Sequence, residues 1–145
     1  MSSRSILLIE DNPDDVVLTL RALQKNGLTN EVIVVRDGVE ALDYLHGRGS
    51  YLGRDVQQLP ALVLLDLKLP RLGGLDLLGQ LRTDPQLHRL RVVVLTSSRE
   101  DEDILTSYSQ GACSYIRKPV DFNDFLKAVG HLGVYWLVLN EPAPV

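Results

Sequence analysis

Cysteine and long apolar runs are scarce in this sequence. The single cysteine, Cys113, cannot form an intramolecular disulfide, which excludes a fold held together by disulfide bonds. No apolar stretch approaches the roughly 20 residues that cross a bilayer as a helix, and the first apolar run, Ile6 to Ile9, is too short for a signal peptide. We therefore expect a cytoplasmic protein with no membrane insertion.

An excess of positive charge is also absent. Nineteen Asp and Glu residues against fifteen Lys and Arg give a net charge of -4, so the overall field repels a phosphate backbone. We expect no direct nucleic-acid binding. The length of 145 residues, with 45% hydrophobic and 23% charged residues, is typical of one globular domain with one functional site.

Short runs of branched apolar residues indicate five strands. Each run is too short for a helix, and its composition is typical of a strand buried on both faces. Four runs are strongly apolar and the last is weaker: Ile6 to Ile9, Val32 to Val35, Leu62 to Leu65, Val92 to Leu95, and Ser114 to Arg117.

Segments with helical spacing follow each of these runs. Asn12 is a candidate N-cap before Pro13, and Asp37 is followed at the capping-box distance by Glu40. Strands that alternate with helices predict a doubly wound α/β fold, in which helices cover both faces of a five-stranded parallel sheet. The five helices are expected to begin at or just after Asn12, Asp37, Gly73, Ser98 and Asp121.

Polar side chains stand where four of the predicted strands end. Glu10 and Asp11 follow the first strand, Asp66 the third, Thr96 the fourth and Lys118 the fifth. Ligands of open parallel sheets bind outside the carboxyl ends of the strands, so these side chains are expected to meet at one edge. Taken singly, each has an ordinary explanation as a helix cap, turn residue, strand-end hydroxyl or surface charge. Together they favour a functional site.

Three carboxylates that lie close together repel one another. A hard cation that prefers oxygen ligands, such as Mg²⁺, relieves this repulsion and accepts a phosphoryl oxygen as a further ligand. Thr96 offers a hydrogen bond and Lys118 a positive charge to the other oxygens. The set is suited to phosphoryl transfer onto a carboxylate.

With these residues in place, the sequence resembles the receiver domain of bacterial two-component response regulators from Ser5 to about Leu132. The resemblance implies a flavodoxin-like, three-layer α/β/α fold and a stand-alone signalling protein, not an enzyme, that assists its own phosphorylation and dephosphorylation. It rests on Glu10-Asp11, Asp66 to Pro70 with Gly74, Thr96 to Ser98, Gly111-Ala112, and Tyr115 to Pro119.

The same resemblance implies that Asp66 accepts the phosphoryl group from a sensor histidine kinase. Asp11, Asp66 and the backbone carbonyl of Lys68 would coordinate Mg²⁺, and Glu10 would reach it through water. Thr96 and Lys118 would hold the phosphoryl oxygens.

Further positions of the family pattern concern switching and turnover. Tyr115 would move inward when Thr96 shifts toward the phosphoryl group, and Pro119 would follow a cis peptide bond. The side chains of Lys68 and Ser98 would flank the path of the attacking water and tune dephosphorylation.

Two segments distinguish this chain from compact members of the family. Residues 46–60 form an extended connection, either a functional loop or a tolerated insertion, and residues 133–145 form a C-terminal extension that contains Tyr135 and Trp136. Both features resemble single-domain receivers that pair with phytochrome-type histidine kinases, which makes a bacteriophytochrome the candidate partner. We expect residues 1–145 to form a single receiver domain.

Two other functions compete with this interpretation. A small Mg²⁺-dependent phosphohydrolase with an Asp nucleophile usually carries a second Asp two residues later as the general acid, and here that position is Lys68. A flavodoxin-like cofactor binder needs a glycine- and hydroxyl-rich loop after the first strand. The acidic segment from Glu10 to Asp15 would instead repel phosphate.

The apolar C-terminal extension also predicts a homodimer. Apolar residues continue after Val129, and an exposed run of this kind is unusual for a monomer. The expected interface comprises the fourth helix, the fifth strand, and the fifth helix with its tail. The alternative is that the run folds back and completes the core of its own domain. The residues concerned are Leu132, Val134, Tyr135, Trp136, Leu137, Val138 and Leu139.

Overall fold

A computed structural model describes residues 4–97 and 113–139, which contain a parallel sheet of five strands in the order β2-β1-β3-β4-β5. The expected doubly wound fold and its strands are confirmed. β3 and β4 each run one residue further than expected and so include Asp66 and Thr96, and β5 begins one residue earlier. The strands are β1 (Ile6–Ile9), β2 (Val32–Val35), β3 (Leu62–Asp66), β4 (Val92–Thr96) and β5 (Cys113–Arg117).

Four of the five predicted helices lie in the described residues and begin where the sequence predicts, whereas the short helices at 49–51 and 136–139 were not predicted. Asn12 caps α1 by accepting hydrogen bonds from two backbone amides, and the Asp37 carboxylate caps α2 by accepting from the amide of Glu40 at 2.7 Å. The expected fourth helix, from Ser98 onward, lies outside the described residues. The helices are α1 (Pro13–Lys25), α2 (Gly38–His46), the short 3₁₀ turn η1 (Gly49–Tyr51), α3 (Gly74–Thr83), α5 (Phe122–His131) and α6 (Trp136–Leu139). Across the part of the chain that is described, none of them is long and apolar enough to span a bilayer.

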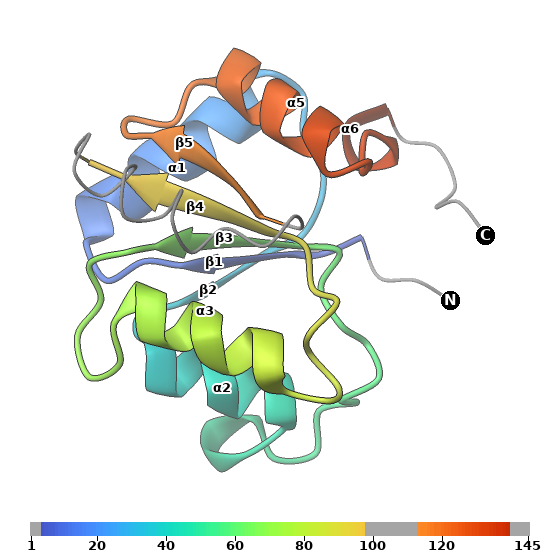
Figure 1. The fold of residues 1–145 in the computed structure, drawn as a ribbon. Helices are drawn as coiled ribbons and strands as arrows, with labels where there is room; N and C mark the ends of the chain where they lie inside the picture. The colour runs from blue at the N-terminus through green and yellow to red at the C-terminus, as the bar shows by residue number, and fades with distance from the viewer. Residues whose placement is uncertain (1–3, 98–112, 140–145) are drawn as a thin grey trace.

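Each face of the sheet has its own apolar core. Alternate residues of β1 point to opposite faces, so Ile6 and Leu8 pack with α1 and α5 while Leu7 and Ile9 pack with α2 and α3. Figure 1 shows the resulting three layers, with α1, α5 and α6 on one side of the sheet and α2 and α3 on the other. With both faces covered, the strand ends are the places where polar side chains can gather.

The extended connection 46–60 folds back on α2. The guanidinium of Arg54 donates to the carbonyls of Tyr44 and Leu45 at the end of α2 and lies 4.2 Å from the centre of the Tyr44 ring. Tyr51 donates a hydrogen bond of 2.6 Å to the carboxylate of Glu40. These contacts anchor the loop, and Leu52 at its tip remains 83% exposed.

The C-terminal extension corrects the expectation of a continuous exposed apolar run. Gly133 adopts a left-handed φ of 73°, and the following amide, that of Val134, donates back to Val129, so the chain turns toward the sheet. Leu132, Val134 and Leu137 are consequently buried in the core on the α1 and α5 side. The alternative, in which the segment completes its own domain, is what these residues adopt.

Other residues of the extension lie nearer the surface. Trp136 is partly buried against the same core, and the Arg4 guanidinium lies 5.6 Å from the centre of its ring. Tyr135 remains 46% exposed. The homodimer therefore stays a prediction that rests on fewer exposed residues than the sequence suggested.

Candidate functional site

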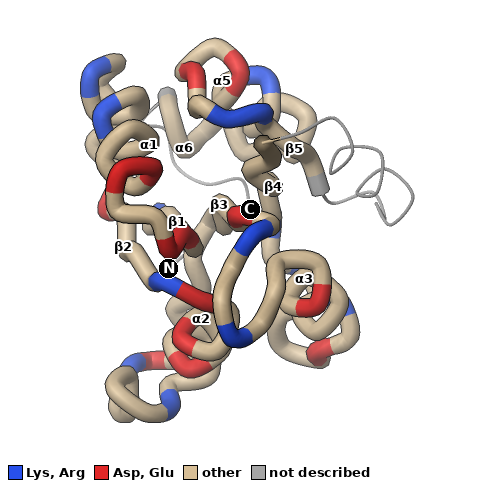
Figure 2. The backbone as a smooth tube through the Cα atoms, turned by 90° about the vertical axis from the view of Figure 1, so that its left-hand side faces the viewer, with Lys and Arg blue, Asp and Glu red and all other residues tan. Residues whose placement is uncertain are grey.

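The sequence-predicted residues meet at the carboxyl edge of the sheet. Glu10 directly follows β1, Asp66 and Thr96 are the last residues of β3 and β4, and Lys118 directly follows β5. Figure 2 shows acidic residues gathered at the end of β1, at the start of α1 and at the end of β3. Parallel strands in register bring these positions together although they are far apart in the chain.

Three acids form the centre of the site. Glu10, Asp11 and Asp66 each place a carboxylate oxygen within 4.8 Å of the other two. Glu10 and Asp66 are buried, whereas Asp11 is exposed. A group of carboxylates with one solvent-facing member is a donor set suited to a hard divalent cation that keeps part of its water shell.

Lys118 supplies the positive charge of the site. Its Nζ lies 2.7 Å from Glu10, 2.9 Å from Asp15 and 3.3 Å from Asp66. Burial alone would lower the pKa of Lys118, but the contacts with Glu10 and Asp15 and the charge of Asp66 outweigh burial and raise it above its ordinary value. Lys118 is thus held protonated among the carboxylates.

The surroundings of the buried Glu10 carboxyl group disfavour its charged form. Burial, followed by the contact with Asp66, raises the pKa of Glu10 to about 7, although the charge of Lys118 acts in the opposite direction. One ammonium group therefore does not compensate the acids fully. A divalent cation at this place would lower the pKa of Glu10.

Thr96 contributes a hydroxyl group suited to an acidic ligand. The side chain is 1% exposed, and its oxygen has no hydrogen-bond partner within the described part of the chain. Its carbonyl accepts from the amide of Lys118 at 2.7 Å, which couples the ends of β4 and β5. A buried hydroxyl without a partner is costly, and a phosphoryl oxygen would satisfy it.

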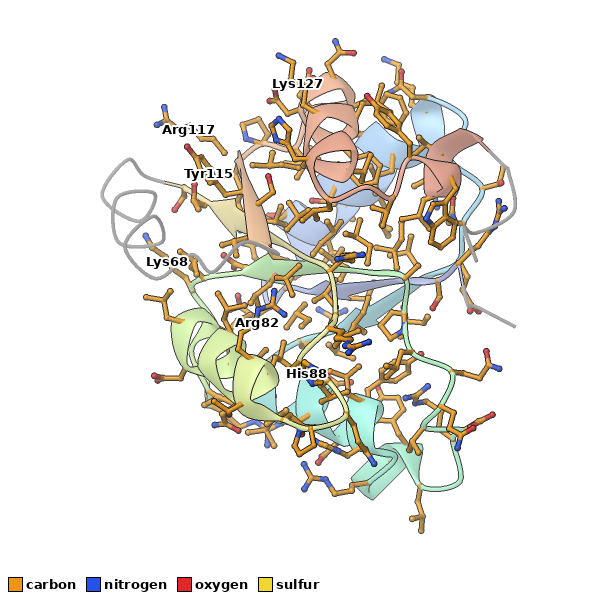
Figure 3. All side chains as sticks on the ribbon, turned by 45° about the vertical axis from the view of Figure 1, so that its right-hand side comes forward. Lys68, Arg82, His88, Tyr115, Arg117 and Lys127 are labelled. Carbon is orange, nitrogen blue, oxygen red and sulfur yellow. The ribbon has the colours of Figure 1, made fainter. Side chains whose placement is uncertain are left out.

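The connection from β3 to α3 fits closely around Asp66. The Lys68 amide donates to the Asp66 carboxylate at 3.2 Å, and a Cβ atom at Gly74 would come within 2.6 Å of the Asp66 carbonyl oxygen. Only glycine fits there. The role of the Lys68 carbonyl as a metal ligand stays a prediction. The side chain of Lys68 is exposed and points outward (Figure 3).

The remaining predicted positions divide into three outcomes. The bond between Lys118 and Pro119 is cis, as expected. Tyr115 is 47% exposed and turned away from the sheet, so its inward movement stays a prediction (Figure 3). Ser98 lies outside the described residues.

An ion pair fixes the outer part of the same connection. Arg71, with φ of 63°, donates two hydrogen bonds of 2.9 and 3.0 Å to the carboxylate of Asp37, the N-cap of α2. A Cβ atom on Gly38 would lie 2.6 Å from the Leu72 carbonyl oxygen, which shows how tightly the connection packs on α2. Although burial raises the pKa of Asp37, hydrogen bonds from the Glu40 amide and Arg71 lower it below its ordinary value.

We predict that the two functions of Asp37 can be separated. Asp37→Asn keeps the cap but loses the charge, and should cost about 1 kcal/mol because Arg71 is largely exposed. Asp37→Ala loses both functions and should cost about 2 kcal/mol. The pKa of Asp37 is below its unfolded value of 3.8, so the charge-dependent stability is present above about pH 4 and disappears as the pH falls further. Urea unfolding at pH 7 and pH 3 measures this, and an unchanged gap between wild type and Asp37→Asn at the two pH values contradicts it.

Sequence reasoning missed Asp15 and Arg71 as parts of this site. Asp15 looked like one of several acids in a first helical turn, where acids commonly favour the helix dipole. Its position three residues after the Asn12 cap was the available signal, since that cap directly follows the strand-end acids. No pattern indicated Arg71, because its contact with Asp37 joins residues that are 34 positions apart.

Comparison with known proteins gives the family. The model of the response regulator receiver domain matches residues 6–130. The chain belongs to the response regulator receiver family. The phosphohydrolase alternative is accordingly not favoured.

Individual relatives are similar to this receiver over nearly its whole length. The probable methanogenesis regulatory protein FilR2 of Methanothrix harundinacea is 40% identical over 142 residues, which are 96% of this receiver and 88% of FilR2. The bacteriophytochrome response regulator AtBRR is 52% identical with a TM-score of 0.88, covering 97% of this receiver and 100% of AtBRR. The Mn²⁺-bound form of response regulator Rcp1 is 33% identical with a TM-score of 0.70, covering 97% of this receiver and 99% of Rcp1.

Proposed function

We propose that this receiver accepts a phosphoryl group on Asp66 from the phosphohistidine of a sensor kinase. In this reaction the phosphorus–nitrogen bond of the donor breaks as a bond forms between phosphorus and an Asp66 oxygen. The observation that carries the proposal is the position of a buried Asp66 carboxylate between two other acids and the ammonium of Lys118, 3.3 Å away. We further infer that the protein works as a signalling switch and not as an enzyme with a separate substrate.

Each residue of the site has a distinct proposed role. Asp11 and Asp66, with the Lys68 carbonyl, would hold Mg²⁺ directly, and Glu10 would hold it through water. The bound cation supplies charge stabilisation to the phosphoryl oxygens. Lys118 would bind a further oxygen, and Thr96 would donate its unpartnered buried hydroxyl to another. The three acids are suited to a divalent cation, and the structure of the relative Rcp1 is a Mn²⁺-bound form.

The switch itself is proposed to join Thr96 to Tyr115. These residues lie on the neighbouring strands β4 and β5, where Thr96 is paired with Arg117 and Val94 with Tyr115. Movement of the Thr96 hydroxyl toward the phosphoryl group would free space into which the exposed Tyr115 ring turns. The side chains of Lys68 and Ser98 are proposed to tune dephosphorylation.

Incubation with acetyl phosphate tests the phosphoacceptor function directly. With Mg²⁺ present, intact-mass measurement should show one added phosphoryl group per chain, and EDTA should prevent it. Slow release of phosphate after the donor is removed is expected of a switch. Repeated rapid release from excess donor would instead indicate a phosphohydrolase and contradict the proposal.

We propose that this receiver acts in the cytoplasm and that its donor is a sensor histidine kinase, with a bacteriophytochrome as the leading candidate because AtBRR carries that description. A donor must approach the acidic edge, and α1 begins there. Val17 and Leu18 of α1 are 50% and 47% exposed, and Val17 lines a shallow groove with Arg21. This apolar patch beside the site is suited to a partner helix.

A charged substitution on α1 should separate kinase docking from chemistry. Val17→Glu is expected to slow transfer from the phosphorylated kinase at least about tenfold, because it places a charge in an apolar contact. Phosphorylation by acetyl phosphate should not change. Leu52→Glu, at the exposed tip of the loop on the other side of the sheet, is the matched control. Equal kinase transfer by Val17→Glu and wild type contradicts the docking surface.

We also propose that residues 1–145 act as one receiver domain that forms a homodimer through β5, α5 and the C-terminal extension. The buried Leu137 supports the single domain, and the half-exposed rings of Tyr115 and Tyr135 are suitable interface anchors. The ring of Tyr135 lies against α5, since a Cβ atom at Gly130 would come within 2.8 Å of it.

Two substitutions in the extension should have different effects. Tyr135→Ala is expected to weaken the dimer at least about tenfold with little loss of stability, because this ring is half exposed. Leu137→Ala should lower the free energy of unfolding by about 2 to 4 kcal/mol, because it leaves a cavity in the core. Light scattering and urea unfolding measure the two effects. A wild type that is monomeric at micromolar concentration contradicts the dimer.

A further inference from the structure

Among the described residues, Asp15 is the one carboxylate in contact with Lys118 that does not belong to the three-acid cluster. Its oxygen lies 2.9 Å from the Lys118 Nζ, closer than the 3.3 Å that separates this atom from Asp66. The Lys118 side chain is only 16% exposed, so its ammonium depends on these carboxylates for most of its contacts. Asp15 therefore holds the amine from the α1 side.

The first turn of α1 is built to hold Asp15 in this place. The side chain of Asn12 accepts hydrogen bonds from the amides of Asp14 and Asp15 at 2.9 and 3.2 Å, which fixes the backbone of the turn. Asp15 is one-third exposed in its ion pair with Lys118. Asp14 is exposed on the same turn and is not among the carboxylates that contact Lys118.

Lys118 and a divalent cation would share two of the same carboxylate groups. Glu10 and Asp66 contact the ammonium in this structure and also belong to the cluster that fits the cation. Two positive groups on the same carboxylates repel each other, so binding of the cation should weaken the contacts of the ammonium with Glu10 and Asp66. Asp15, outside the cluster, stays available as the partner of the ammonium.

We propose that Asp15 is a positioning residue that retains Lys118 on the α1 side and so leaves Glu10 and Asp66 to the divalent cation. Without Asp15, the described part of the chain leaves Lys118 only the carboxylates of the cluster, so the ammonium competes with the cation more strongly. The retained amine also stays within reach of a phosphoryl group on Asp66. This inference rests on the proposed function of the site.

Calorimetric titration of the full chain with Mg²⁺ tests the proposal, with Asp14→Asn as the matched control. Both Asp15→Asn and Asp14→Asn remove one negative charge from the same helical turn. Screening at physiological salt should limit the effect of Asp14→Asn to about twofold in the dissociation constant. Asp15→Asn should weaken Mg²⁺ binding at least about fivefold, and Asp15→Glu should restore most of it.

A Lys118→Ala background shows whether Asp15 acts through the amine. When Lys118 is replaced, the effect of Asp15→Asn on Mg²⁺ affinity should fall to that of the Asp14→Asn control. An effect that persists there, or an Asp15→Asn effect no larger than the control in the parent chain, overturns the inference.

A parallel measurement of wild-type phosphorylation separates this inference from the function on which it rests. If wild type takes up one phosphoryl group and binds Mg²⁺ but Asp15→Asn behaves as the control, the inference fails and the function stands. If wild type neither binds Mg²⁺ nor takes up a phosphoryl group, both fail.

Discussion

Asp66→Asn should abolish phosphorylation while leaving the fold intact. The amide has nearly the same shape as the carboxylate, so the end of β3 should keep its packing, but the amide is not a nucleophile. Asp66 is 4% exposed, is the last residue of the central strand β3, and lies 3.3 Å from the Nζ of Lys118. We expect the intact-mass shift from acetyl phosphate to fall below detection, a loss of at least about a thousandfold in rate.

The matched control is Asp76→Asn, which removes an exposed acid from the first turn of α3. This variant should be phosphorylated like wild type. Urea unfolding should show that Asp66→Asn is folded. A phosphoryl group that is still present on Asp66→Asn would show that another residue is the acceptor.

Lys118→Ala should strongly lower the stability of the metal-free protein. The substitution leaves Glu10, 0% exposed, and Asp66 without the cation between them. Removing one partner of a buried ion pair typically costs about 3 kcal/mol or more. Some phosphorylation should remain, but it should no longer be coupled to the conformational change.

The loss should depend on pH through Glu10. In wild type the folded state already raises the pKa of Glu10 from 4.5 to about 7. The protonated carboxyl group therefore contributes its full stability below pH 4.5, and this contribution is lost as the pH rises through the folded pKa. Without Lys118 this trend should steepen, so the variant should be least stable near pH 8. Mg²⁺ should restore much of the loss, because it supplies the missing positive charge.

Urea unfolding at pH 5 and pH 8, each with EDTA or Mg²⁺, measures these effects. Lys127→Ala is the control, since this exposed lysine of α5 points into solvent (Figure 3). Equal stability of Lys118→Ala and wild type at pH 8 in EDTA would show that the acids do not depend on the amine.

The fold and the centre of the site were predictable because both follow from local patterns. Short branched apolar runs identified the strands, and a parallel sheet necessarily brings their carboxyl ends together. Glu10, Asp66 and Thr96 were therefore found from their positions immediately after or at the end of apolar runs. The caps at Asn12 and Asp37 were likewise set by side chains that bond to their own neighbourhood.

Contacts between distant segments were beyond that reasoning. The pairing of Arg71 with Asp37 depends on a left-handed backbone at Arg71 itself. The sequence gives no signal for this conformation, because it is usually adopted by glycine or asparagine. The extension was misread because an apolar run does not say which way it turns, and the turn at Gly133 directs Val134 inward. Tertiary geometry decided the first case, whereas in the second Gly133 was the available signal for a turn.

The contact of Arg4 with Trp136 has a practical consequence for reporter design. It brings both ends of the described chain together where the strands begin, the edge opposite Asp66. A fluorophore or surface linker attached there would stand clear of an approaching kinase, but Trp136 itself would be a poor optical probe of phosphorylation. A circular permutant that joins these neighbouring ends and opens at the Leu52 tip should keep the acidic edge unbroken.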